Sequence, residues 1–419
     1  MVNKRNNCIM LLEFAIQNFK SFKELQIFSL DASNEQEDDE SIVRVVKIKG
    51  DYRVVKTKAI YGANASGKSN LILGLVAVWK ILDKNLKDDE IFQEFISPYR
   101  LDTELITQPS YFQIIFLHEG NKYRYGFEVD TEKVHREWLY LKREKEVVLF
   151  EREGQQLTEL NETTFKEGKI LKQGIKMFTE KTLVISVLDQ LSSPISSLVK
   201  ERITGKIIIM PNLPARSRLS NPLFMQTIHN FENDDTFKDW VVKLLHEIDG
   251  SIVDSELRKA VAPDGQTHKI PIIFRTINDD KIPFILENEE AAGTKKVFDF
   301  SCIIYRSIKE GNTLIIDEMD ALLHPKLTRK IIELFQSPDA HEEAQLIFAT
   351  HDTNLMDSEL LRRDQITFLE KSDEGDSEIY DLSDIKGVRS KDLFERNYLK
   401  GNYGAIPNLN QLEKVLLDV

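Results

Sequence analysis

The chain has 419 residues, of which 41% are hydrophobic, and this length suits two or three structural units with a large core. Its net charge of −13 argues against a protein that attracts nucleic acid over its whole surface. Cys8 and Cys302 are too few for a disulfide framework, and no apolar run approaches the roughly 18 residues that cross a membrane, so we expect a cytoplasmic protein without membrane contact.

The first strong pattern in the chain is a phosphate-binding loop. Residues 62–69 read Gly-Ala-Asn-Ala-Ser-Gly-Lys-Ser and fit the pattern G-x-x-x-x-G-K-[ST]. Apolar residues before this loop predict a strand that includes Ala59-Ile60-Tyr61, and those after it predict a helix that reaches Ile81. Lys68 would reach the β- and γ-phosphates of a nucleotide, and the Ser69 hydroxyl would hold Mg²⁺. A chance match in a glycine-containing loop is the alternative, and the strand and helix on either side count against it.

Between this loop and the next motif, the pattern changes twice. Residues 110–152 alternate apolar and polar positions around a Gly120-Asn121 turn, which predicts a β-meander. Residues 160–250 place apolar side chains at loosely helical intervals, with a break at Ser192-Ser193-Pro194, and predict mostly helices. Because Lys68 and the acidic motif at Asp317 are much farther apart in the sequence than one βαβ unit requires, we expect a large insertion in the sheet.

A second apolar run, Thr313-Leu314-Ile315-Ile316, predicts a buried parallel strand that ends at Asp317-Glu318. Ligands of open α/β sheets bind at the carboxyl ends of the strands. Beside a phosphate loop, acids at this place are typical of a Walker B motif. Asp317 would support Mg²⁺ through its water shell, and Glu318 would act as a general base toward the attacking water. The alternative is a polar turn or helix cap before Pro325.

A third apolar run, residues 345–349, predicts another buried strand, which ends at Thr350-His351-Asp352. A histidine at this end of a strand can reach the γ-phosphate or the attacking water. His351 therefore joins Glu318 and Lys68 as a predicted catalytic residue. A structural or surface role is the alternative for a single histidine.

The order of these motifs resembles that of ABC-class ATPases, especially the SMC/RecF/OLD branch. The residues that carry the resemblance are Asn18-Phe19-Lys20-Ser21-Phe22, Asn64 in the phosphate loop, the run from Asp317 to Pro325, and Thr350-His351-Asp352. The greatest likeness is to RloA-type ATPases, small OLD-related proteins that are often encoded with a partner in bacterial phage-defence loci. The resemblance implies an α/β fold, namely a P-loop NTPase head of the ABC type with an antiparallel β arm and a helical insertion.

The resemblance also implies a domain organisation and a set of ATP and Mg²⁺ contacts. Residues 1–154 would form the N-terminal part of the head, 155–270 a mainly helical insertion, and 271–419 the C-terminal part of the head. Ser69 and Asp317 would form the metal site, with Asp317 acting through the water shell of Mg²⁺. The residues implied to contact the nucleotide are Gly62, Asn64, Ala65, Ser66, Gly67, Lys68, Ser69, Asn70, Gly293 and Thr294.

In ABC-class ATPases two heads enclose two nucleotides, so the resemblance implies a homodimer or a higher oligomer. Gly293 and Thr294 would form the signature, which contacts the partner's γ-phosphate from a helix N-terminus. ABC signatures usually have a serine two residues before this glycine, whereas this chain has Ala291, which implies slow hydrolysis or reliance on backbone groups. His324 stands where the family often has aspartate. Apart from the other motifs, Thr294 would be an ordinary helix N-cap.

The sequence thus predicts an ATPase whose ATP-driven association controls a partner effector, a nuclease or toxin encoded nearby, in anti-phage defence. One alternative is a nucleotide-gated DNA-binding or repair ATPase of the RecF/SMC type. Another is an OLD-like ATPase-nuclease that would use the acids between residues 373 and 378, which predict a hairpin tip. A third is a sensor scaffold with negligible turnover. The Q-loop glutamine stays open among Gln93, Gln108 and Gln113.

Overall fold

Six strands form a mainly parallel central sheet in the computed structural model. Their order is β11 (Ile207–Met210), β15 (Thr313–Ile316), β16 (Gln345–Ala349), β5 (Thr57–Tyr61), β17 (Ile366–Lys371) and β18 (Ser377–Asp381). All neighbours pair in parallel except β17 and β18, which form an antiparallel hairpin. Every residue of β5, β15 and β16 is buried, as expected of parallel strands that are covered on both faces.

The structure describes residues 9–34, 42–84, 86, 90–172, 179–211, 222–261, 267–278, 280–321 and 323–407. Of the run from Asp317 to Pro325, Leu322 lies outside these ranges. Within the described part of the chain, no helix has the length and apolar character needed to cross a membrane.

A seven-stranded antiparallel sheet lies beside the central sheet. Its order is β10 (Gln156–Leu160), β9 (Glu146–Glu153), β8 (Val134–Lys142), β7 (Asn121–Val129), β6 (Ser110–His118), β1 (Ile9–Gln17) and β2 (Gln26–Ser29). The predicted meander is confirmed, with β6 and β7 joined at Glu119-Gly120. Two short strands, β3 (Val45–Ile48) and β4 (Tyr52–Val55), form a separate ladder ahead of β5.

Helices cover the two faces of the central sheet, and the chain alternates between two hydrophobic cores. Helix α1 (Lys68–Lys84) packs against β1, where a Cβ added to Gly74 would lie 2.5 Å from Ile16 Cδ1. Successive residues of β15 point to opposite faces of the sheet and so pack into different cores. Ile315 packs into the core that contains α1. Leu314 packs into the core that contains α8 (Ala292–Glu310) and α9 (Pro325–Gln336). The buried Gln345 side chain at the start of β16 joins the two sheets, since its Oε1 accepts from the Leu11 N–H and its Nε2 donates to the Leu11 carbonyl.

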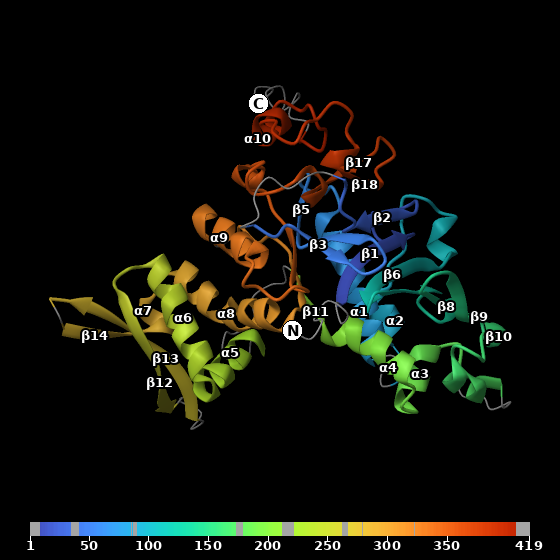
Figure 1. Ribbon diagram of the computed structural model, residues 1–419, viewed down its shortest axis with the longest axis horizontal. Coiled ribbons are helices and arrows are strands. Elements are labelled where there is room, and N and C mark those ends of the chain that lie inside the picture. Colours follow the sequence, from blue (N-terminus) through green and yellow to red (C-terminus); the bar gives the residue numbers. More distant parts are fainter. Residues whose placement is uncertain are drawn as a thin grey trace.

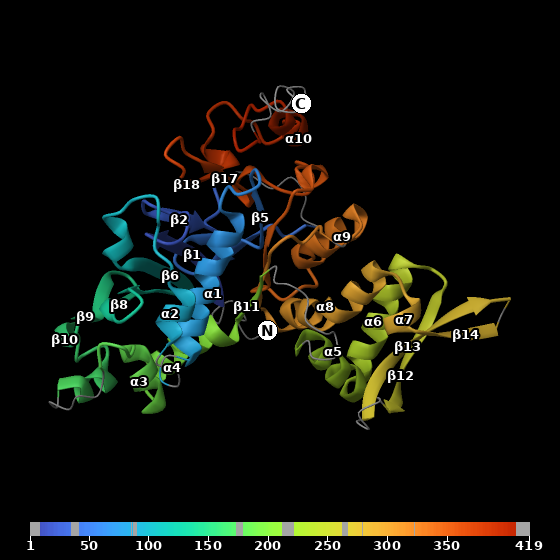
Figure 2. The same cartoon turned by 180° about the vertical axis from the view of Figure 1, so that it is seen from behind.

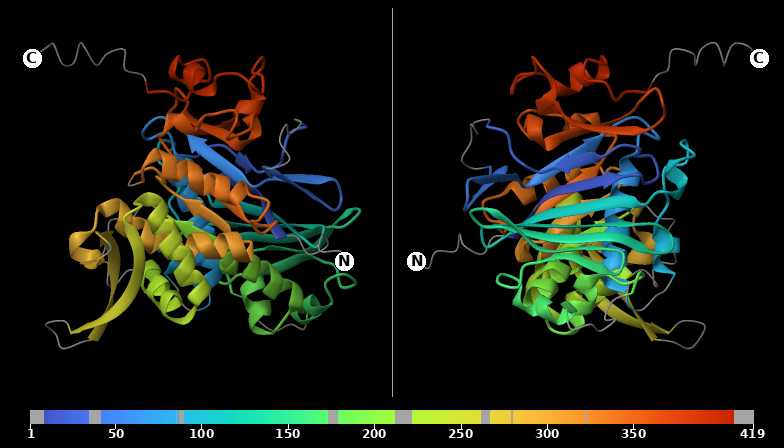
Figure 3. Two further views of the ribbon diagram at one scale, coloured as in Figure 1. Left: turned by 60° about the vertical axis from the view of Figure 1, so that its left-hand side comes forward. Right: turned by 90° about the vertical axis from the view of Figure 1, so that its right-hand side faces the viewer.

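The molecule extends to both sides of the central sheet (Figures 1 and 2). On one side lie the antiparallel sheet, α2 (Ile91–Phe95), α3 (Val184–Gln190) and α4 (Pro194–Lys200). On the other side lie α5 (Pro222–Asn233), α6 (Asp235–Ile248), α7 (Leu286–Glu289) and a sheet of β12 (Ile252–Val261), β13 (Thr267–Ile277) and β14 (Asp280–Ile285). The C-terminal segment with α10 (Phe394–Leu399), red in Figure 3, lies at one end of the molecule.

The segment expected as a mainly helical insertion, residues 155–270, is more mixed than its pattern indicates. Its helices α3 to α6 are present, but β11 joins the edge of the central sheet and β12 belongs to the three-stranded sheet. The four residues of β11 are too short for a periodicity to distinguish them from helix. The domain boundaries at 154 and 270 stay a prediction.

Candidate functional site

The loop between β5 and α1 is shaped by two glycines that have no room for a side chain. A Cβ added to Gly62 would lie 2.2 Å from the carbonyl oxygen of Leu369, and one added to Gly67 would lie 2.4 Å from Ser377 Oγ. Gly67 also has φ +115°, a backbone conformation that favours glycine. The loop therefore lies directly against the β17–β18 hairpin, and contact with that hairpin fixes its path.

Serine hydroxyl groups from distant parts of the chain form hydrogen bonds with this loop and with the start of α1. The Oγ of Ser377 donates to the carbonyl of Ser66 at 2.7 Å and is hydrogen-bonded to Ser21 Oγ at 2.8 Å. The Asn70 side chain donates to the same Ser21 hydroxyl at 2.9 Å. Ser377 carries no recognisable signal in the sequence, because nothing in the residues around it distinguishes it from any other strand serine. Asn64, Ala65 and Ser69 are exposed on the outer side of the loop.

Lys68 lies across the loop that it follows. Its Nζ donates to the carbonyls of Gly62 at 2.8 Å and Ala63 at 3.1 Å. Burial lowers the pKa of Lys68 below its ordinary value, and nearby carboxylates act in the opposite direction. Those carboxylates are Asp317, Glu318 and Asp320. The sequence-distant acids therefore lie close enough to Lys68 for their charges to act on it.

The acids after β15 occupy a strained and buried turn. The Asp317 N–H donates to the Met210 carbonyl at 2.9 Å, which fixes the end of β15 against β11. Asp317 is 8% exposed, and its Oδ1 has no hydrogen-bond partner among the described residues. Glu318 has φ +50°, a left-handed conformation that costs a non-glycine residue about 1–3 kcal/mol and often occurs at functional sites. A buried carboxylate oxygen without a partner is costly, and a bound cation would satisfy it.

The histidine after β16 lies at the same edge of the sheet. The backbone nitrogen of His351 lies 3.3 Å from both carboxylate oxygens of Asp320 and donates to them. This contact joins the turn after β16 to the turn after β15. Burial, and then the positive charge of Lys68, lower the pKa of His351 below its ordinary value. Carboxylates act in the opposite direction, and these are Asp320, Glu318 and Asp317. Asp320 was not singled out from the sequence, although its place two residues after Glu318 was a usable signal.

The predicted signature residues begin a different element. Helix α8 has Ala291 as its N-cap, with no side-chain capping bond, and Gly293 and Thr294 lie in its first turn. Thr294 is buried inside the helix, so the alternative that it caps the helix is wrong. Lys296 lies two residues after Thr294; burial lowers its pKa below the ordinary value, and the charges of Asp320 and Glu318 act in the opposite direction. His324 caps α9, where its Nδ1 accepts the N–H of Lys326 at 3.2 Å.

The three glutamine candidates for the Q-loop differ in their secondary structure and in their exposure to solvent. Gln93 lies exposed on α2, and Gln108 lies exposed after a 3₁₀ turn. Gln113 is buried on β6, where its Oε1 accepts the Trp138 indole N–H at 3.2 Å. The choice among them stays open.

The acidic hairpin tip is confirmed as the turn between β17 and β18, and part of it is engaged in hydrogen bonds and ion pairs. Asp376 bonds Ser372, and Glu374 pairs with Lys23 at 3.3 Å. Across the described residues, no group of three or more His, Cys, Asp or Glu side chains is arranged to hold a metal ion.

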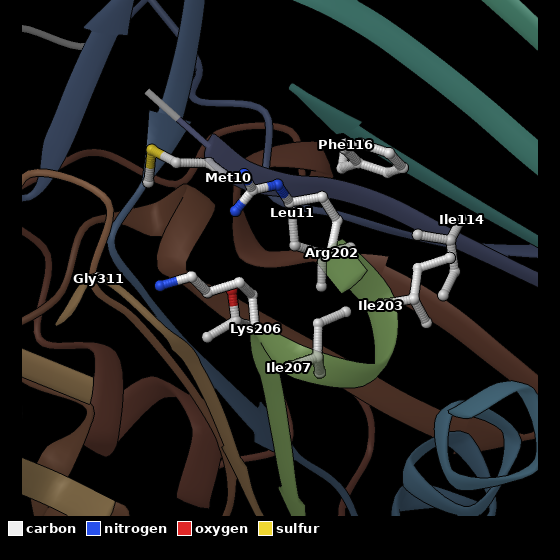
Figure 4. A pocket seen from close by; sticks show the side chains of 10 residues that line it. Met10, Leu11, Ile114, Phe116, Arg202, Ile203, Lys206, Ile207 and Gly311 are labelled. Atoms are coloured by element: carbon white, nitrogen blue, oxygen red, sulfur yellow. The ribbon is translucent and has the colours of Figure 1, made fainter. Parts of the chain in front are cut away.

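A small pocket, shown in Figure 4, lies at the amino end of β15, whereas the phosphate loop follows the carboxyl end of β5. It is lined by Gly311 and Thr313 at the start of β15, whereas Asp317 follows the end of that strand. Arg202 and Lys206 also line it, and the Lys206 ammonium donates to the Glu310 carbonyl at 3.0 Å. The pocket is thus separate from the site built around Lys68.

Comparisons with known proteins bear on this arrangement. The family described as "AAA domain, putative AbiEii toxin, Type IV TA system" matches residues 59–357, which include the phosphate loop, both acids and His351. The chain belongs to this AAA-domain family. Its membership confirms the predicted class of P-loop protein, while the finer relation to RloA-type proteins stays a prediction. The search of curated proteins gives no match.

Two solved structures are similar to this AAA-domain protein at low sequence identity. One is described as the SmcHead bound to the C-winged helix domain of ScpA, with 13% identity, a TM-score of 0.48, and coverage of 89% of this chain and 98% of that chain. The other is the SMC head domain from Thermotoga maritima, with 15% identity, a TM-score of 0.41, and the same two coverages.

Proposed function

We propose that this AAA-domain protein is a magnesium-dependent ATPase of the ABC type whose ATP-driven association controls a partner effector. The observation that carries the proposal is the set of charged side chains at the carboxyl ends of the parallel strands. Lys68 spans the phosphate loop, and the buried Asp317 oxygen without a partner lies within its electrostatic reach. A basic group on a phosphate loop beside an unsatisfied carboxylate matches the needs of a nucleotide triphosphate and its cation.

Phosphate binding in this proposal rests on the backbone of residues 62–69 and on Lys68. Glycine positions leave the N–H groups of the loop accessible, and the N-terminus of α1 favours negative charge. Lys68 would exchange its two carbonyl partners for phosphate oxygens. Ser69 and Asp317 would hold Mg²⁺, which neutralises phosphate charge when bound.

Hydrolysis in this proposal depends on Glu318 and His351. Glu318 would accept a proton from the attacking water as general base. The lowered pKa of His351 favours the neutral imidazole at neutral pH, which can hydrogen-bond the γ-phosphate or the water without adding charge. Asp320 holds the backbone of the His351 turn and would position this histidine.

Association would place the start of α8 in one copy, with Gly293 and Thr294, against the nucleotide of the second copy. The resulting homodimer or higher oligomer would switch a nuclease or toxin in the bacterial cytoplasm as part of anti-phage defence. The membership of an AAA-domain family described by a putative toxin supports this setting.

Two substitutions test the ATPase. Glu318→Gln should retain ATP, lower the rate of phosphate release by about 100-fold or more, and accumulate an associated state. Lys68→Ala should abolish ATP binding and therefore association. Phosphate release and light scattering after size exclusion measure the two properties. Glu333→Gln and Lys80→Ala are matched controls on α9 and α1 and should behave like the wild type. Equal, fast turnover by Glu318→Gln and the wild type would contradict the base assignment.

A nucleotide-gated scaffold with negligible turnover is the second candidate, and Ala291 favours it. The N-cap of α8 offers no side-chain hydroxyl where ABC signatures usually have one. A turnover assay with and without DNA and the neighbouring gene product separates the two. ATP-dependent association without stimulated phosphate release would support the scaffold.

A further inference from the structure

Arg275 connects three elements next to the start of α8. It lies on β13, and its guanidinium binds the Glu290 carboxylate in a two-pronged arrangement, with Nη2 at 2.8 Å from Oε2 and Nε at 3.2 Å from Oε1. Its Nη1 also donates to Ser251 Oγ at 2.6 Å and pairs with Asp249, in the turn between α6 and β12. Paired, planar contacts of this kind fix direction as well as distance.

Glu290 immediately precedes Ala291, the N-cap of α8. The side chain of Glu290 is only 2% exposed, so its carboxylate is withdrawn from water into the contact with Arg275. A carboxylate next to a helix N-terminus is attracted by the partial positive charge of the free N–H groups there. In this structure the carboxylate is held by β13 instead.

The direction of the Glu290 carboxylate decides what the helix N-terminus can bind. An unpaired carboxylate there would occupy the N–H groups and repel an incoming phosphate. The Arg275 guanidinium is shared between the Glu290 and Asp249 carboxylates, so it offsets one of their two negative charges and leaves the cluster with one in place of two. The charged residue of the first turn of α8 is Lys295, and Lys296 follows it, within the electrostatic reach of Asp320 and Glu318.

We infer that Arg275 is a positioning residue that holds the Glu290 carboxylate away from the start of α8, so that this helix can receive phosphate from a second copy of the chain. The inference rests on the proposed function, in which Gly293 and Thr294 contact the partner's nucleotide. Asp249 and Ser251 keep the guanidinium in place, since both bind the nitrogen that does not contact Glu290.

The test compares Arg275→Gln with the double variant Arg275→Gln/Glu290→Gln. Arg275→Gln releases the Glu290 charge and should weaken MgATP-dependent association by about tenfold, which corresponds to about 1.4 kcal/mol. The double variant removes that charge and should recover association to within about threefold of the wild type. Binding of a fluorescent ATP analogue to the single chain should stay within about twofold in both variants, because the phosphate loop is unchanged.

Arg258→Gln is the matched control. Arg258 lies on β12 of the same sheet and pairs with Glu256 at 2.5 Å in an exposed contact. Its loss should leave association unchanged, since exposed ion pairs contribute little. Analytical ultracentrifugation measures association, and thermal unfolding verifies that each variant is folded.

The outcomes separate the inference from the proposed function. If the wild type does not associate with MgATP, the proposed function and this inference are both overturned. If the wild type associates and Arg275→Gln associates equally well, only the inference is overturned. Should Arg275→Gln fail to fold, the double variant decides. Association like the wild type supports the role of the Glu290 charge, whereas lost association in a folded chain that still binds ATP overturns it.

Discussion

The phosphate loop and the start of α8 are both glycine-containing helix N-termini, but the structure supports them in different ways. At the phosphate loop, Gly62 and Gly67 touch the β17–β18 hairpin so closely that a single methyl group would clash. Next to the start of α8, the ion pair of Arg275 with Glu290 holds the residue that precedes the N-cap. The first region is therefore governed by packing and the second by charge. Substitutions that change volume should affect the first, and substitutions that change polar groups should affect the second.

Of the substitutions that test this contrast, the one with the largest expected effect changes packing at the phosphate loop. Gly67→Ala should weaken ATP binding by about 30-fold, because overpacking against Ser377 and backbone strain at φ +115° together cost roughly 2 kcal/mol. Titration with a fluorescent ATP analogue measures it. Gly154→Ala is the control, since Gly154 also has positive φ, at +52°, but has no atom within 4 Å of an added Cβ.

A second substitution sharpens this test. Ser377→Gly removes the atoms nearest to the new methyl group and should restore part of the ATP affinity of Gly67→Ala. If Gly67→Ala binds ATP as Gly154→Ala does, the loop is not fixed by the hairpin, and the contrast between the two regions fails.

A smaller effect is expected at the start of α8. Ala291→Ser supplies the hydroxyl that ABC signatures usually have, and it should strengthen MgATP-dependent association by about fivefold, or about 1 kcal/mol. The same serine would cap α8 and raise the melting temperature. Light scattering and thermal unfolding report the two gains separately. A raised melting temperature without stronger association would show that this position only caps the helix.

The smallest effect concerns the pH dependence of His351. Its pKa in the folded chain lies below the ordinary value of 6.5, so the unfolded chain binds the proton more readily. The stability contribution of the neutral histidine is therefore complete above pH 6.5 and is lost as the pH falls through the folded-state pKa. His351→Asn should reduce the acid-induced fall in melting temperature between pH 7 and 5. An equal fall in His351→Asn and the wild type would show that protonation of this histidine does not act on folding.

Local pattern determined the elements that carry the chemistry. The strand, loop and helix around residues 59–81 follow from apolar runs and a glycine pattern, and the structure contains them as β5 and α1. The runs that end at Asp317 and at His351 are buried strands, as expected of continuous apolar segments in a parallel sheet. The β-meander follows from alternation and a turn signal. Each of these signals lies within a few neighbouring residues, so a single sequence is enough to detect it.

Contacts between residues that are far apart in the sequence decided how these elements are held in position. Only the folded chain places Ser377 under the phosphate loop, β11 at the edge of the central sheet, and Arg275 against Glu290. The residue at which α8 begins also depends on the folded chain, since Ala291 rather than Thr294 is the N-cap of the helix. These features depend on which distant surfaces pack together, and packing energy overrides the weak local preferences of short segments. The sequence by itself therefore determined which residues can perform the chemistry, and the tertiary structure decided what holds them in position.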